Sequence, residues 1–196
     1  MNPAELLTKN LRLSIAAKQN FLDRPDQIEA FARAVDVVVN AYRHGGRLYL
    51  AGNGGSAADA QHFAAELIGR FEQERSAWPA IALTTDTSIL TAIGNDYGFD
   101  QVFARQVQGL GAAGDILLGI STSGHSKNVM GAVQAAKSQG MTTIGLLGRD
   151  GGLLKTGMDQ AVVVPVSNTA RIQEAHSFIL HYWAMLLEQR LAGAAI

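Results

Sequence analysis

A run of hydroxyl side chains follows one of the short apolar segments of this chain. Ser121, Thr122, Ser123 and Ser126 give four hydroxyls within six residues, after the apolar run 116–120 and before a helical pattern. Hydroxyls and the free N–H groups at a helix start both donate to phosphate oxygens. Helix capping is the alternative, because Ser and Thr are favoured N-caps, but capping uses only one or two hydroxyls. We therefore predict that this turn binds phosphate.

A glycine-rich turn, Gly52-Asn53-Gly54-Gly55-Ser56, comes directly after the apolar run Leu48–Ala51. Glycines let the backbone approach an anion closely, and the next helix directs its positive end toward the same place. The turn has neither the ending of a P-loop nor the spacing of a dinucleotide fingerprint. Taken alone, it is as typical of a plain tight turn as of a binding site.

Imidazole and carboxylate side chains recur at helical spacing. His62 and Glu66 are four residues apart, so they face the same side of a helix. Such a pair can bind a divalent metal or place a base beside a substrate, although most such pairs are solvated neighbours. Gln173 and His181 are eight apart, roughly 12 Å of rise and an offset near 80° on a straight helix. They converge only if the side chains lean together or the helix begins irregularly, and His176 lies off their line.

A third polar segment, Gly94-Asn95-Asp96-Tyr97-Gly98, closes a helical stretch. Asn and Asp commonly fill turns through local side-chain to backbone hydrogen bonds, so a structural role is the simpler interpretation. A functional role for Asn95 and Asp96 depends on the other segments.

The elements that must position these residues alternate along the chain. Five flat apolar runs have the length and pattern of strands covered on both faces. They are Leu48–Ala51, Ala80–Leu83, Ile116–Ile120, Thr143–Leu147 and Val162–Val166. Between and after them lie helical patterns at Ala57–Phe71, Ser88–Ile93, Gln101–Leu110, Lys127–Ser138 and Ala170–Leu191. This alternation predicts an α/β fold with a doubly wound, parallel, five-stranded sheet, whose ligands lie at the carboxyl ends of the strands.

Two amphipathic helices precede the first strand. With no linker long enough to mark a second domain, we predict one domain over 1–196, made of a helical region at 1–44 and an α/β core at 45–196. The two helices either cover the sheet or form a subunit interface, and we favour the interface.

Composition excludes several classes of protein. The net charge is −1, with 16 basic and 17 acidic residues mixed along the chain, so no basic stripe indicates a nucleic-acid partner. The longest apolar runs fall far short of the about 20 residues that span a membrane. The absence of cysteine excludes disulfides and thiolate metal sites and favours a cytoplasmic location.

Together the motifs resemble those of a known family. The segments 52–56, 61–67, 95–96, 121–124 and 171–174 occur in the order and spacing of the phosphoheptose isomerases, which are sugar isomerase (SIS) domain proteins. The resemblance covers nearly the whole chain and implies a flavodoxin-like fold. It also implies conversion of D-sedoheptulose 7-phosphate to D-glycero-D-manno-heptose 7-phosphate through an enediol, the first step of bacterial ADP-heptose and GDP-heptose precursor synthesis.

The resemblance also implies roles for particular residues. Substrate-binding roles fall on Asn53, Gly54, Gly55, Ser56, Glu66, Asn95, Asp96, Ser121, Thr122, Ser123, Ser126 and Gln173. The resemblance implies that one zinc ion per subunit is bound by His62, Glu66, Gln173 and His181. It also implies that Glu66 and His181 transfer protons. These roles conflict in part, because a lone pair given to a metal is not available to a base. The family is typically a homotetramer whose sites are shared between subunits.

Some features depart from the family pattern, and one alternative function stays open. His125 stands where Asn is frequent, and Ala170 where some members have Asp, which weakens any mechanism that needs a carboxylate there. Relatives with the same fold act as non-catalytic adaptors that bind the bacterial replication initiator protein. Because Glu66 and His181 are both present, we favour the isomerase.

Overall fold

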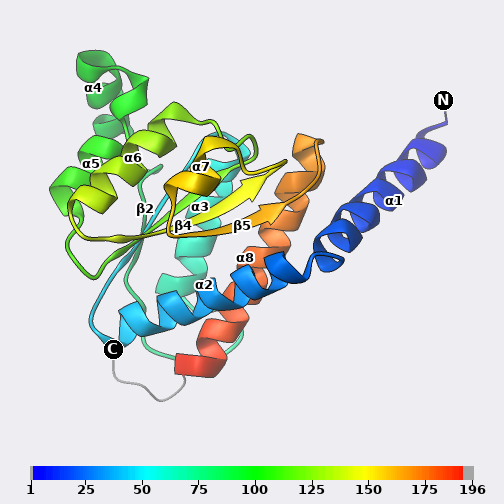
Figure 1. The fold of residues 1–196 in the computed structure, drawn as a ribbon, viewed down its shortest axis with the longest axis horizontal. Helices are drawn as coiled ribbons and strands as arrows, with labels where there is room; N and C mark the ends of the chain where they lie inside the picture. Colours follow the sequence, from blue (N-terminus) through cyan, green and yellow to red (C-terminus); the bar gives the residue numbers. More distant parts are fainter. Residues whose placement is uncertain (1, 192–196) are drawn as a thin grey trace.

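A computed structural model describes residues 2–191. Its centre is an all-parallel sheet of five strands in the order β2-β1-β3-β4-β5 (Figure 1). The strands are β1 Leu48–Gly52, β2 Ala80–Ala82, β3 Ile116–Ser121, β4 Thr142–Gly148 and β5 Gln160–Val164. The order is that of flavodoxin-like folds. The predicted doubly wound, five-stranded α/β fold is confirmed.

Helices cover both faces of the sheet, which explains why the central strands are flat apolar runs without alternation. One face packs against α2 Pro25–Arg43, α3 Gly55–Ile68 and α8 Thr169–Leu191. The other face packs against α5 Ala104–Leu110, α6 Lys127–Ser138 and α7 Gly152–Gly157. A short helix, α4 Thr87–Tyr97, has no buried residue and leads into a 3-10 turn, η1 Phe99–Gln101.

The two leading helices have different roles. α2 buries an apolar face that includes Val35, Val39 and Tyr42 in the core, so this helix covers the sheet. α1, Pro3–Leu22, buries only Ala17 and extends away from the sheet (Figure 1). Only α1 therefore keeps a long apolar face for a subunit interface.

The structure differs from the predicted elements where proline and glycine act locally. β5 ends at Val164 and not at Val166, because Pro165 has no N–H to continue the ladder. The glycine-rich segment 148–152 leads into α7, which the sequence did not predict. The helix predicted from Gln101 begins at Ala104, after η1. None of the described helices is long and apolar enough to cross a membrane.

α3 and α8 lie side by side with their chains running in the same direction (Figure 1). Ser177 of α8 donates to Asp59 of α3, with 2.8 Å between Oγ and Oδ1. Further along, His181 meets His62. The two pairs differ in residue number by 118 and 119, so the helices keep one register over this length. That register brings polar side chains of two distant segments together.

Candidate active site

The glycine turn and the hydroxyl turn lie at the point where the sheet changes winding direction. β1 and β3 are neighbours, but β1 leads into α3 on one face and β3 leads toward α6 on the other. Open α/β sheets bind ligands in the crevice at such a switch point, beyond the carboxyl ends of the strands. The fold therefore supports both turns as parts of one site.

The hydroxyls of the turn converge. Ser121 Oγ lies 3.0 Å from Ser126 Oγ and 3.5 Å from Ser123 Oγ, and it accepts a hydrogen bond from the N–H of Gly124. Ser126 is the N-cap of α6, yet its side chain makes no capping hydrogen bond. Capping therefore does not use this hydroxyl, and the phosphate-binding interpretation of the turn gains support.

The loop after β4 packs against the hydroxyl turn. Gly124 has a φ of +69°, and a Cβ at this position would come within 2.1 Å of the carbonyl oxygen of Gly151. The carbonyl of Gly124 also accepts from the N–H of Leu154 at 3.0 Å. The loop after β4 thus packs directly against the turn and fixes its path.

The glycine turn approaches α8 closely. An added Cβ at Gly55 would lie 2.1 Å from the side-chain amide nitrogen of Gln173, so only glycine fits there without a shift. Gln173 therefore lies at the start of α3, beside the turn. Asn53 reaches in the opposite direction and pairs with Asn128 of α6 through two hydrogen bonds of 2.8 Å.

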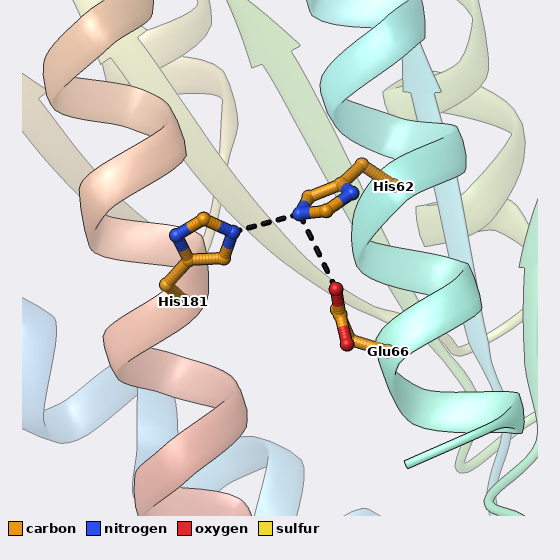
Figure 2. Close-up of side chains that lie close together, drawn as sticks. All are labelled: His62, Glu66 and His181. Atoms are coloured by element: carbon orange, nitrogen blue, oxygen red, sulfur yellow. Dashed lines mark hydrogen bonds and ion pairs between the residues drawn. The ribbon is translucent and has the colours of Figure 1, made fainter. Parts of the chain in front are cut away.

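Two turns along α3 and α8, three side chains meet at the surface (Figure 2). His62 Nε2 lies 2.7 Å from His181 Nε2 and 3.4 Å from Glu66 Oε1. The two imidazole rings meet edge to face, and Phe71 stacks on His181 with 5.6 Å between the ring centroids. The predicted meeting of Glu66 with His181, from segments more than 100 residues apart, is present in one chain.

This cluster has the donor set of a zinc site. One ligand atom from each of His62, Glu66 and His181 lies within 4.8 Å of the others. Two imidazole nitrogens aimed at each other and one carboxylate are ligands that zinc prefers. Among residues 2–191, these side chains fit the predicted metal, and the identity of the ion stays a prediction.

Three predicted residues lie apart from this cluster. Gln173 precedes His181 by eight residues on the unbroken helix α8, about 12 Å along its axis. Asn95 and Asp96 are helical and exposed at the end of α4, not in a turn, and Asn95 donates to Asp96. Figure 1 shows α4 at one end of the molecule, apart from α8. The zinc-ligand role of Gln173 and the sugar-binding roles of Asn95 and Asp96 stay predictions. They require that a second chain or a conformational change brings these residues to the cluster.

Asp59 is a polar residue of the site that the sequence did not predict. It lies between the glycine turn and His62 on α3, is 9% exposed and is bonded to Ser177. Burial raises the pKa of Asp59, opposed by the Ser177 hydroxyl and by the nearby His62 and His181. Its position one turn before His62 was a usable signal, because residues at this spacing share a helix face.

His176 has a structural role that predicts acid sensitivity. It is fully buried, and burial, opposed in part by the backbone of Leu147, lowers its pKa from 6.5 to about 4. Below pH 6.5 the His176 side chain is protonated in the unfolded chain but stays neutral in the folded chain. Stability from neutral His176 is therefore complete above that pH and is lost as the pH falls toward 4, by about 3 kcal/mol. The free energy of unfolding from urea titrations at pH 7 and 4.5, compared with that of His176→Leu, measures this loss. An equal pH dependence in both proteins would contradict it.

Comparison with known proteins identifies the domain. The sequence model of the SIS domain family matches residues 16–148. A phosphoheptose isomerase of Geobacter sp. (strain M21) is 57% identical over 162 residues, which cover 83% of this chain and 84% of that protein. One from Sulfurimonas denitrificans is 48% identical over 190 residues, 97% of each chain.

Solved structures agree with the sequence relatives. The phosphoheptose isomerase from Neisseria gonorrhoeae is 45% identical, with a TM-score of 0.90 over 96% of this chain and 100% of that one. The one from Francisella tularensis is 40% identical, with a TM-score of 0.91 and the same coverage. The fold and the matched domain thus define a SIS-domain protein. Within that class, the chain belongs to the phosphoheptose isomerase family, a family of isomerases.

Proposed function

We propose that this protein interconverts D-sedoheptulose 7-phosphate and D-glycero-D-manno-heptose 7-phosphate, an early step in making activated heptoses. Support comes from the relatives, which are named phosphoheptose isomerases. The observation that carries the proposal is the cluster of His62, Glu66 and His181 on α3 and α8, two helices that meet beside the glycine turn. An anion site and a carboxylate–imidazole pair are the two parts that such an isomerisation requires.

The reaction moves two protons. A base removes a proton from C1 of the ketose, next to the C2 carbonyl, and the carbonyl oxygen O2 takes up a proton, which gives an enediol. A proton returned to C2, and loss of the O1 proton as the C1 carbonyl forms, complete the aldose. Glu66, with a half-buried carboxylate, and His181 are the proposed proton-transfer pair.

A metal ion fits the same cluster. His62, Glu66 and His181 are the proposed ligands in one chain, and Gln173 is the proposed fourth. A bound zinc ion supplies Lewis-acid polarisation of the sugar carbonyl. Because a carboxylate has two oxygens, Glu66 can give one to a metal and keep the other for a proton.

The site is proposed to be shared between subunits of a homotetramer. Gln173 and the two turns lie at one end of the α3–α8 pair, and the His62–Glu66–His181 cluster lies about two helical turns away. Near the cluster's helices, an apolar groove of about 420 Å³ between α1, α2 and α8 lies open. We propose that a second copy covers this groove and brings its own turns to the cluster.

Sharing predicts that two inactive variants complement each other. Ser123→Glu places a negative charge in the phosphate turn, and Glu66→Gln removes one member of the proton-transfer pair. Each variant alone is expected to be inactive, but tetramers reassembled from an equal mixture are expected to regain about a quarter of the wild-type rate. Mixed tetramers no more active than either parent would contradict the sharing of sites.

An activity assay tests the function itself. Purified protein incubated with sedoheptulose 7-phosphate is expected to form the aldose, and a chelator is expected to slow the reaction if the metal takes part. Lack of turnover with added zinc would overturn the proposal and return attention to the adaptor alternative. The meeting of the carboxylate and imidazoles favours the isomerase, because an adaptor has no use for it. A cytoplasmic location fits this substrate and stays a prediction.

A further inference from the structure

Asn53 and Asn128 form a closed amide pair across the switch point of the sheet. Asn53 Nδ2 donates to Asn128 Oδ1, and Asn128 Nδ2 donates to Asn53 Oδ1, each at 2.8 Å. Asn53 belongs to the turn after β1, and Asn128 to the first turn of α6, directly after the hydroxyl turn. The pair is the side-chain link between the turn proposed to hold the sugar and the turn proposed to hold the phosphate.

The orientation of the pair is fixed from one side. Asn128 is 3% exposed, and its Oδ1 also accepts a hydrogen bond from the N–H of Val129 at 3.0 Å. A backbone N–H needs an acceptor, so Val129 decides which end of the Asn128 amide is oxygen. Asn128 in turn decides which end of the Asn53 amide faces it.

Asn53 keeps capacity for a ligand. A side-chain amide has two N–H donors and two oxygen lone pairs, and the pair uses one of each on Asn53. Asn53 is only half-buried, whereas Asn128 is buried. The remaining N–H and lone pair of Asn53 are thus held in one direction at the mouth of the crevice.

We propose that Asn128 is a positioning residue, which holds the Asn53 amide in the orientation that binds a hydroxyl of the sugar phosphate and fixes its spacing from the phosphate turn. The inference rests on the proposed function and deepens it. Asn128 does not itself contact the substrate. It acts through Asn53, and this sets it apart from a residue that only stabilises α6.

The test is a double-mutant cycle. Asn128→Asp keeps the volume and the acceptor for Val129 but removes the donor and places two oxygens face to face. It is expected to lower kcat/KM for sedoheptulose 7-phosphate by about 10- to 100-fold, as is Asn53→Ala. In the Asn53→Ala background, Asn128→Asp is expected to have almost no further effect, because there is no amide left to orient. Losses that multiply, or an Asn128→Asp protein with the wild-type kcat/KM, would overturn the inference.

A matched control and a substitute variant accompany the double-mutant cycle. Gln27→Glu makes the same amide-to-carboxylate change at a buried site on α2, where the acceptor for the N–H of Val163 is retained. It is expected to change the melting temperature and leave kcat/KM unaltered. Should Asn128→Asp not fold, Asn128→Ser removes the same donor with a residue that suits a first helical turn.

Binding separates this inference from the proposed function. The same cycle, measured by calorimetry as the affinity for sedoheptulose 7-phosphate in a Glu66→Gln background, needs no turnover. If the losses of affinity are coupled, the role of Asn128 is supported. If the wild-type protein is at the same time inactive, only the proposed isomerase function is overturned. Independent losses of affinity, or no binding by the parent chain, would overturn the role of Asn128.

Discussion

Replacing Glu66 by Gln is expected to lower kcat for sedoheptulose 7-phosphate by about 10²- to 10⁴-fold, the range for loss of a positioned acid or base. The amide has nearly the same shape but cannot take part in proton transfer. Glu66 Oε1 faces His62 at 3.4 Å, and the side chain is 21% exposed, so the substitution leaves no buried gap. Steady-state kinetics and a thermal melt on the same preparation separate lost chemistry from lost folding.

The matched control is Glu29→Gln on α2. Glu29 makes an exposed ion pair with Arg33, and its side chain is 73% exposed, so the same change there is expected to leave kcat within twofold or so. A Glu66→Gln protein with a near-normal rate would remove Glu66 from the mechanism. A protein that loses its rate only because it has unfolded would show a lowered melting temperature.

Glu188→Gln is expected to have the largest effect on stability, about 3–5 kcal/mol. The Glu188 carboxylate on α8 is 2% exposed and accepts N–H donors from residues 71, 72 and 73 and from the Arg75 side chain. The amide removes the charge and presents an N–H to those donors, which leaves the Arg75 guanidinium, 10% exposed, without its charged partner. Urea unfolding measures the loss as a lower midpoint.

The same substitution reaches the site through Arg75. Arg75 also donates to the carbonyls of Glu66 and Leu67, at 2.7 and 2.9 Å, and so caps the end of α3 that carries Glu66. Glu74→Gln, which alters an exposed pair with Arg70 in the same loop, is the control and is expected to change stability by less than about 1 kcal/mol. Equal effects from the two substitutions would contradict the account.

The pH dependence of the Glu188 contribution has a definite sign. Burial on its own raises the pKa of Glu188, but the three backbone N–H donors and Arg75 outweigh it and hold the pKa below its ordinary 4.5. A carboxylate with a lowered pKa in the folded chain stabilises fully above that ordinary value and loses its contribution as the pH falls below it. This acid loss adds to that of His176, which begins at a higher pH.

The sequence predicted the fold well because local patterns decide it. Each of the five strands was predicted within two residues of its observed ends, since flat apolar runs between helical patterns have few other structures available. The exceptions arise from single residues, such as Pro165 at the end of β5. Which leading helix covers the sheet was open, because both are amphipathic and only packing separates them.

The candidate site was predictable in part. The hydroxyl turn follows from residue types and strand ends, and the meeting of Glu66 with His181 was expected only through the family resemblance. The register of α3 with α8 had a signal in two polar stripes, 59, 62 and 66 on one helix and 173, 177 and 181 on the other. The Asn53–Asn128 and Arg75–Glu188 pairs had none, because each joins segments whose proximity only the tertiary fold creates.

Turnover in D₂O, followed by NMR, tests the central claim most directly. If a carboxylate and an imidazole that both reach solvent pass protons through an enediol, the aldose formed from sedoheptulose 7-phosphate carries deuterium at C2. Glu66→Gln protein should form both the aldose and deuterated ketose far more slowly than the wild-type protein. Aldose without deuterium at C2 would contradict proton transfer by these side chains. The absence of any reaction in the zinc-loaded wild-type protein would contradict it as well.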